Sequence, residues 1–245
     1  MNSYQKEVLQ ELWSWQKAML KKPSLWGRLS KKLQYKLNSY IPEKLHEAIT
    51  VTIKQTVRGV LFGAGITTSL PPEERSFEVT EAIIKERIAF YQKTAAAEGG
   101  ITGAGGILLG LADFPLLIGI KLKLLYDIAA LYGFNIRDYR ERLYILHIFQ
   151  LAFSSQEQRK KVYLQMVDWD AHVYLLPEDI NTFDWRTFQQ EYRDYIDLAK
   201  MAQLVPVIGA PVGAVVNYRL LKKLGITAMN AYRMRLEQKR TETNS

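Results

Sequence analysis

The sequence predicts an all-α protein, folded as a compact multi-helix bundle of about ten helices with a central glycine-rich helical hairpin. Three observations predict this fold. Apolar residues recur at three- and four-residue steps along most of the 245-residue chain, which is the spacing of an amphipathic helix. Almost no segment alternates apolar and polar residues as a half-buried strand would. Prolines and glycines interrupt the helical pattern at intervals, as they do between helices.

Two amphipathic helices are expected at the start of the chain, over residues 4–20 and 24–41. Each carries its apolar residues near one face. Pro23 and Pro42 stand where helices begin, because proline fits the first turn of a helix. No composition shift or low-complexity tract marks a domain boundary after them.

Further helices are expected along the rest of the chain. They cover roughly residues 43–62, 77–97, 101–112, 115–132, 137–153, 155–174, 184–203, 209–223 and 227–239. Gly133, Pro177 and Gly225 separate some of them, and Ser154 with Glu157 has the spacing of a capping box. The expected organisation is basic amphipathic helices over 1–41, a single all-α domain over 42–240 and a disordered tail over 241–245.

Composition limits the kinds of site that the chain can carry. It has no cysteine, which excludes disulfides, iron–sulfur clusters and thiol nucleophiles and favours a reducing compartment. Its first residues mix charged and apolar side chains, unlike a secretory signal. Of the net charge of +8, residues 1–40 hold eight Lys or Arg against two Glu, and residues 219–240 hold seven against one Glu. We therefore expect a cytoplasmic protein with separate basic and acidic surfaces.

Residues 99–120 are the most unusual stretch, with seven glycines and a single ionisable residue, Asp113. Because Pro115 disfavours a helical Phe114, the helix should break at 112–114 and restart with Pro115 in its first turn. The two arms are then too short to span a bilayer. Asp113 fits a helix cap, although a functional buried acid is an alternative.

Glycines spaced four apart recur in three charge-free stretches, 59–72, 99–112 and 201–218. Such spacing lets helices approach closely, so we expect these stretches to pack together around one glycine- and alanine-lined centre. Asn217 fits there as a satisfied core amide or as a ligand-binding group. The predicted core motif comprises Gly99, Gly100, Gly103, Gly106, Gly110, Asp113, Pro115, Gly209, Gly213 and Asn217.

The run AAAEGGITGAGGILLGLADFPLLIGIKLKLLYDIAALYGFN, the later LVPVIGAPVGAVVNYRLLKKLG and a final AMNAYR together resemble the EcsC family of bacteria. The resemblance covers roughly residues 45–235, which leaves the first 40 residues outside it. The family is named after a gene that accompanies an ABC-transporter ATPase and its membrane subunit in Gram-positive bacteria. The resemblance therefore implies an association with membrane transport, with the ATPase or the membrane subunit as a partner. It implies no reaction and no catalytic residues.

Basic residues and tryptophans gather in the first 40 residues, as in a helix that lies on an anionic lipid surface. The predicted membrane-binding residues are Trp13, Trp15, Lys17, Lys21, Lys22, Trp26, Arg28, Lys31, Lys32 and Lys36. The competing interpretation is an ordinary amphipathic helix whose lysines are solvated. No nucleic-acid partner is expected, because no recognisable nucleic-acid motif accompanies the basic residues.

Candidates for enzyme chemistry are few. Asp168 and His172 would share a helix face one turn apart, which makes them a weak metal pair. A solvated acidic face explains the same residues. His46 and His147 fit packed or surface positions better than catalytic bases. GGITGAGG lacks the Gly-Lys-Ser/Thr ending of a phosphate loop, and no cofactor is expected.

These observations together favour an accessory or regulatory protein over an enzyme. We expect it to lie peripherally on the inner face of the cell membrane, held by anionic lipid or by a transporter subunit. In a bolder version the hairpin over residues 99–132 inserts into the lipid. The alternative is an enzyme or a small-ligand binding protein, with a lipid as the ligand, that uses a pocket near Asp113 and Asn217.

Overall fold

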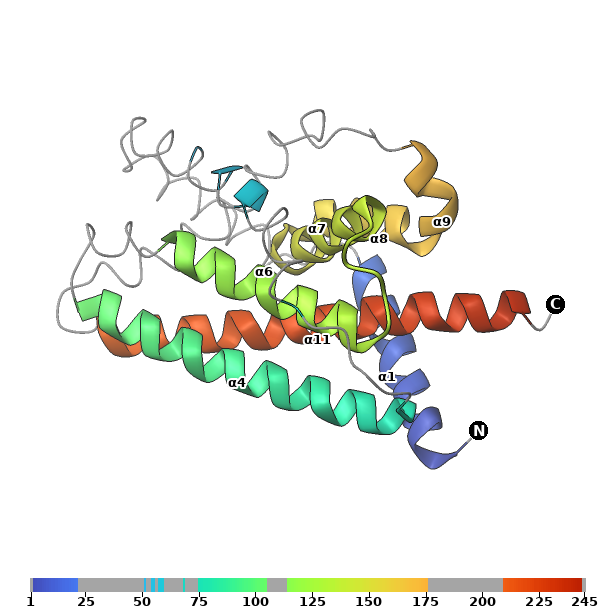
Figure 1. Ribbon diagram of the computed structural model, residues 1–245, viewed down its shortest axis with the longest axis horizontal. Coiled ribbons are helices and arrows are strands. Elements are labelled where there is room, and N and C mark those ends of the chain that lie inside the picture. The colour runs from blue at the N-terminus through green and yellow to red at the C-terminus, as the bar shows by residue number, and fades with distance from the viewer. Residues whose placement is uncertain are drawn as a thin grey trace.

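The computed structural model describes residues 2–21, 75–104, 114–175 and 209–243, together with residues 51, 54, 55, 57–59 and 68. Within these residues the regular structure is helical, so the all-α prediction is confirmed there (Figure 1). The helices are α1 (Ser3–Leu20), α4 (Phe77–Ala104), α6 (Phe114–Leu131), α7 (Tyr139–Phe153), α8 (Gln156–Val167), α9 (Trp169–His172), the 3-10 helix η1 (Val173–Leu175) and α11 (Gly209–Thr243).

Helices α4 and α11 run antiparallel side by side and form the longest pairing in the described structure (Figure 1). Helix α6 packs against both of them, and α7 packs against α6, α8 and α11. Helix α1 crosses this layer and contacts α8 and α11. The last helix therefore touches most of the others and organises the core.

The antiparallel register of α4 and α11 is set by close contacts. A Cβ added to Gly225 would lie 2.6 Å from Cδ1 and Cγ1 of Ile88, so this glycine lets the two helices approach. Gln92 farther along α4 donates from Nε2 to the Tyr218 carbonyl, 3.3 Å away. The predicted break at Gly225 is therefore wrong, and α11 is one helix of 35 residues.

Other boundaries also differ from expectation. Helix α4 continues to Ala104, so the predicted separation of 77–97 from 101–112 is wrong. The Ser154 N–H donates to the Gln150 carbonyl at 2.8 Å, which places Ser154 at the end of α7. Ser155 caps α8 instead, because its side chain accepts from the Gln158 N–H. The predicted helix 155–174 is divided into α8, α9 and η1.

Two local signals from the sequence are confirmed around α6. Pro115 lies in the first turn of this helix. Gly133 ends the segment with φ of +83°, a conformation that glycine adopts at low cost. Its N–H donates to the Ala130 carbonyl at 2.9 Å, and the Phe134 N–H donates to the Ala129 carbonyl at 3.0 Å. This is the Schellman pattern of a helix end.

The core is built from large aromatic and aliphatic side chains. Tyr126, Tyr144, Tyr232, Phe149 and Phe153 are among the largest side chains that are fully buried. Helix α7 is buried on nearly all sides. In the described ranges, no helix combines the length and the apolar character needed to cross a membrane. The glycine-rich hairpin itself is not confirmed, because residues 105–113 lie outside the described part, as do the predicted helices over 24–41 and 184–203.

Candidate functional site

Helix α1 lines three cavities of the described structure. It begins with a capping box, in which the Gln5 N–H donates to Asn2 Oδ1 at 2.8 Å and the Asn2 N–H donates to Gln5 Oε1 at 3.0 Å. Val8, Leu12 and Met19 are its buried residues. Their spacing places them on the side of the helix that faces the core.

A buried ion pair connects α1 with the core. Glu81 on α4 is fully buried and accepts from Nε and Nη2 of Arg233, both at 2.6 Å. Tyr4 and Tyr132 donate their hydroxyls to the same carboxylate at 2.6 and 2.8 Å. Arg233 also donates to Glu11 at 2.8 Å. The cluster therefore joins α1, α4 and α11 to the turn that follows α6.

The pKa of Glu81 reflects these contacts. Burial by itself raises the pKa of this carboxyl group, but the hydrogen bonds from Arg233 and Tyr4 outweigh that effect and leave the pKa below its ordinary value. Glu81 is thus a permanently ionised structural acid at neutral pH. This removes it from consideration as a general acid.

A second buried pair lies nearby. Arg235 donates from Nη1 to Glu141 Oε2 at 2.7 Å, and the Tyr232 hydroxyl donates to Oε1 of the same carboxylate at 2.6 Å. The Arg235 guanidinium also lies 4.4 Å from the ring centroids of Phe134 and Tyr144. Stacking and pairing together satisfy this charge, so the cluster has a structural explanation as well.

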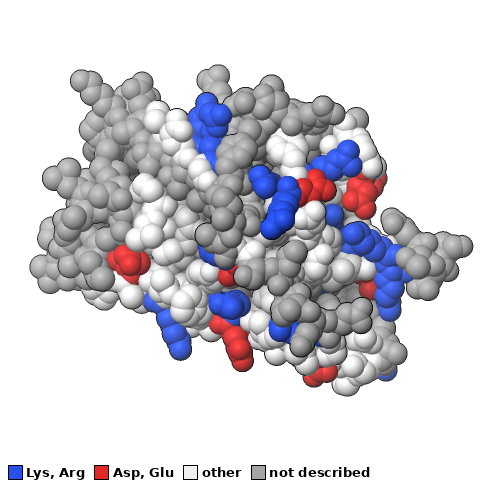
Figure 2. Space-filling view, in the orientation of Figure 1, with Lys and Arg blue, Asp and Glu red and all other residues white. Residues whose placement is uncertain are grey.

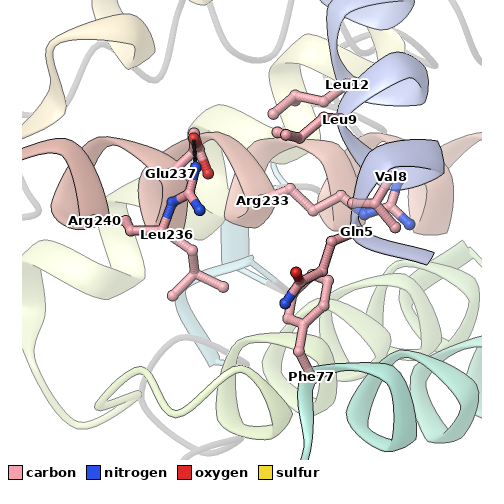
Figure 3. Close-up of a pocket in the computed structure, with 9 residues that line it drawn as sticks. All are labelled: Gln5, Val8, Leu9, Leu12, Phe77, Arg233, Leu236, Glu237 and Arg240. Carbon is pink, nitrogen blue, oxygen red and sulfur yellow. Dashed lines mark hydrogen bonds and ion pairs between the residues drawn. The ribbon is translucent and has the colours of Figure 1, made fainter. Parts of the chain in front are cut away.

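Three cavities adjoin α1. The first has a volume of about 240 Å³ and lies between α1, the start of α4 and α11 (Figure 3). Its charged groups are paired, since Arg240 donates to Glu237 at 2.6 Å and Arg233 belongs to the Glu81 cluster. The second, of about 680 Å³, has side chains of both signs, including Glu7, Glu11 and Lys85. We call it the mixed cavity.

The third cavity differs in charge. It has a volume of about 360 Å³ and lies between α1, α8 and α11, with Leu151 of α7 in its wall. Its lining residues are Trp15, Met19, Leu151, Arg159, Arg219, Lys222, Lys223, Ile226 and Thr227. Among these described residues there are four cations and no carboxylate. We call it the basic cavity.

The basic cavity and the mixed cavity are neighbours, because both are lined by Trp15, Lys222 and Ile226. Burial and the nearby charge of Arg159 lower the pKa of Lys223 to about 8. Elsewhere, on the face shown in Figure 2, basic side chains of the described residues stand beside acidic ones. The basic cavity thus concentrates one sign of charge in a recess.

The predicted membrane-binding residues divide into three groups. Trp13 is 58% exposed, and Lys17 and Lys21 are also exposed. Trp15 is half-buried and packs edge-on against Tyr163 with a centroid distance of 5.8 Å. The others lie outside the described residues: Lys22, Trp26, Arg28, Lys31, Lys32 and Lys36.

The predicted core motif is only partly described. Gly99, Gly100 and Gly103 lie in the last turns of α4, and Gly209 and Gly213 lie in the first turns of α11. If the register set by Ile88 and Gly225 continues, these two ends lie level with each other. Gly106, Gly110 and Asp113 lie outside the described residues, so the predicted pocket near Asp113 stays a prediction.

Asn217 is buried, as expected, with 3% of its surface exposed. Its Nδ2 has no hydrogen-bond partner among the described residues, so the expectation of a satisfied amide is not met there. An unpaired buried amide costs free energy. Asn217 is thus a buried amide whose Nδ2 the described residues do not satisfy.

The weak metal pair lies at the end of α8. Asp168 is exposed, and the His172 N–H donates to the Asp168 carbonyl at 2.9 Å. No third side chain of a metal-binding type joins them in the part of the chain that the structure describes. His147 is a packed histidine, as expected, and its Nδ1 lies 2.8 Å from the Leu143 carbonyl.

The basic cavity itself was missed by the sequence reasoning. Four residues of α11 that line the cavity lie on one helix face, because three of them come three, four and seven positions after the first. They are Arg219, Lys222, Lys223 and Ile226. The positive charge of residues 219–240 was a usable signal. The charge pattern alone does not reveal that α1 and Arg159 of α8 lie opposite this face.

Comparisons with known proteins give a consistent result. A family model described as the EcsC protein family matches residues 6–236. Protein EcsC of Bacillus subtilis (strain 168) is 43% identical over 230 residues, covering 94% of this chain and 94% of that protein. The uncharacterized protein YdbA of the same organism is 27% identical over 251 residues, covering 94% of this chain and 91% of that protein. The match begins at residue 6, so it includes α1, which the resemblance read from motifs over 45–235 did not. No solved structure matched the chain.

Proposed function

Because the chain belongs to the EcsC protein family, we propose that it is a membrane-associated accessory or regulatory protein linked to an ABC transporter. It docks on the anionic cytosolic face of the membrane through the outer face of α1, as a peripheral protein. The link to a transporter rests on the family resemblance. The docking rests on the side chains that α1 exposes.

The observation that carries the docking is the composition of this outer face. Four residues of α1 are separated by seven, four and three positions, so they lie on one side of the helix. They are Lys6, Trp13, Lys17 and Leu20. Trp13 is 58% and Leu20 is 44% exposed, and both lysines are exposed. Large apolar side chains between lysines are typical of helices in the membrane interface.

The magnitude is sufficient for reversible binding. Each lysine near an anionic surface contributes about 1 kcal/mol, and burying the exposed parts of Trp13 and Leu20 adds roughly 2 kcal/mol more. With Lys21, the total is roughly 5 kcal/mol, which salt would weaken. This describes a protein that associates with the membrane transiently and needs a second partner, such as a transporter subunit, to stay there.

Flotation with vesicles tests the docking. Wild-type protein is expected to float with vesicles that contain phosphatidylglycerol at low salt, and to remain behind with phosphatidylcholine alone. The double variant Trp13→Ala/Lys17→Gln should bind at least about tenfold more weakly. The matched control is Phe90→Ala/Lys93→Gln, which removes an exposed aromatic and an exposed lysine from α4. Equal binding by both variants, or no binding by the wild type, would refute docking through α1.

The link to a transporter needs a test in cells. A photo-crosslinking amino acid at exposed Phe90 of α4, which the docking leaves uncovered, should attach to an ABC-transporter ATPase or its membrane subunit. The same amino acid at Trp13 should attach to lipid instead. Cells in which neither transporter component is cross-linked from several exposed positions would contradict the link.

A further inference from the structure

The basic cavity has the size and chemistry of a ligand site. Its volume of about 360 Å³ lies within the range of roughly 300–1,000 Å³ typical of small-molecule pockets. The cations come from two helices, Arg159 from α8 and the other three from α11. The apolar wall comes mainly from Trp15 and Met19 of α1 and Leu151 of α7.

The position of Arg159 is fixed by local contacts. Its Nη2 donates to the Ser154 carbonyl at 3.2 Å, and its Nη1 donates to Gln156 Oε1 at 3.4 Å. Arg159 belongs to the first turns of α8, whose N-terminal end carries partial positive charge. The guanidinium and the helix end therefore present positive potential on the α8 side of the cavity.

Opposite Arg159, α11 presents lysines on the face that lines the cavity. Burial, and to a smaller extent the nearby charge of Arg159, lower the pKa of Lys223 to about 8. An anion in the cavity would lie among four cations and no described carboxylate, and an opposite charge within hydrogen-bond distance stabilises a cation. The arrangement is therefore suited to an anion.

We propose that the basic cavity binds the phosphate headgroup of a single anionic phospholipid, whose acyl chains leave past Trp15 and Ile226. This inference rests on the proposed docking, because the membrane supplies the lipid. The protein would then have two separate lipid contacts, a specific site for one lipid molecule and the surface of α1 that docks on the membrane.

The apolar wall favours a lipid over inorganic phosphate. A phosphate ion would contact the cations but not the exposed apolar surface of Trp15 and Ile226. A lipid would place its glycerol and first methylenes against them, and each buried methylene contributes about 0.8 kcal/mol. Ile226 is 44% exposed at the rim, and the mixed cavity beyond it is lined by Ile88 and Met229 as well. Ile226 and the half-buried Trp15 therefore offer apolar surface to the start of the acyl chains.

The α1 side of the cavity is firmly held, which keeps the site formed. The Gln156 Nε2 donates to the carbonyls of Ala18 and Lys21 at 3.4 and 3.0 Å. These bonds tie the end of α1 to the start of α8, next to Arg159. A preformed site of this kind loses little conformational entropy when a ligand binds.

A soluble short-chain lipid separates this site from membrane docking. Dihexanoyl phosphatidylglycerol, used below its micelle concentration, should bind wild-type protein in a calorimetric titration with one site per chain. Dihexanoyl phosphatidylcholine and inorganic phosphate should bind at least about tenfold more weakly. The variant Arg219→Gln/Lys222→Gln, which changes two exposed residues, should lose at least about tenfold in affinity for phosphatidylglycerol.

The matched control is Lys160→Gln/Lys161→Gln on α8, which removes two exposed cations outside the cavity and should bind like the wild type. A second variant, Ile226→Glu, places a carboxylate at the rim and should likewise lose at least about tenfold in affinity. Far-UV circular dichroism verifies that each variant is folded.

Several outcomes would overturn the lipid site. Equally tight binding of inorganic phosphate would make the cavity a phosphate site. Equal weakening by Arg219→Gln/Lys222→Gln and by Lys160→Gln/Lys161→Gln would show that the cavity is not the binding site. No binding of the short-chain lipid would also refute the inference. If the wild type floats with vesicles but ignores the short-chain lipid, this inference fails and the docking stands. If it binds the short-chain lipid but does not float, the docking fails and the site stands.

Discussion

Replacing Glu81 by glutamine removes the charge at the centre of the buried cluster while keeping nearly the same shape. Glu81 has no exposed surface and accepts four hydrogen bonds, two of them from Arg233. The glutamine amide would direct N–H groups toward one of the guanidinium nitrogens, so donors would face each other. Arg233 would keep Glu11, which is 54% exposed in its side chain, as its remaining carboxylate.

The expected loss is large. Removing one partner of a buried ion pair costs about 3–5 kcal/mol, and here Arg233 would stay buried with only the half-exposed Glu11 as a carboxylate partner. For a chain of this size, 1 kcal/mol corresponds to a melting-temperature shift of about 2–4 °C, so Glu81→Gln should lower the melting temperature by about 6–20 °C. Urea unfolding followed by circular dichroism gives the free energy directly.

The matched control is Glu78→Gln, the same substitution at an exposed position one turn earlier in α4. It should change the free energy of unfolding by no more than about 0.5 kcal/mol. A double variant with Arg233→Gln should lose less than the sum of the two single losses. If Glu81→Gln is as stable as Glu78→Gln, the cluster does not hold the helices together as described.

The pH dependence gives a second measurement on the same variant. The pKa of Glu81 is lowered in the folded protein. The ionised carboxylate therefore contributes fully to the free energy of unfolding above the unfolded pKa of about 4.3. This contribution is lost as the pH falls through the folded value. The difference in stability between wild type and Glu81→Gln should therefore shrink below about pH 4. A difference that stays constant on acidification would contradict an ionised Glu81.

Three further predictions concern separate features. Burial lowers the pKa of His147 to about 4, so stability should fall by about 3 kcal/mol as the pH decreases from about 6.5 to 4, and His147→Gln should flatten that slope in urea titrations. Gly225→Ala gains about 1 kcal/mol of helix propensity but forces a Cβ to 2.6 Å from Ile88, at a cost of about 1–3 kcal/mol. It should lower the melting temperature, and an increase would refute the close approach. Asn2→Ala removes the cap of α1 and should cost about 1 kcal/mol in urea unfolding, whereas exposed Ser3→Ala should cost little.

The features that the sequence predicts correctly depend on neighbouring residues. The helix expected over 4–20 is α1, Pro115 lies in the first turn of α6, and Gly133 ends the segment after it. In each case the signal is local: the apolar spacing of the helix, the fixed φ of proline or the freedom of glycine to adopt a positive φ. Secondary structure of this kind can be predicted from a single sequence.

The features that could not be predicted depend on distant residues. Gly225 can end a helix or admit a neighbouring one, and only Ile88, 137 positions earlier in the numbering, decides between them. Glu81 and Arg233 are 152 residues apart, and nothing in either local pattern indicates a pair. Likewise, the charge of Lys222 and Arg219 was visible, but the recess that it lines is formed by α1 and α8.

The central position of α11 has a consequence for how the chain is made. On the ribosome α4, α6 and α7 are synthesised long before α11, yet each packs against it. Until α11 emerges, their apolar faces lack the surface that covers them in the finished protein, and such intermediates are prone to aggregate. The nascent chain therefore depends on chaperones or on rapid completion of translation more than a protein whose early helices form a core of their own.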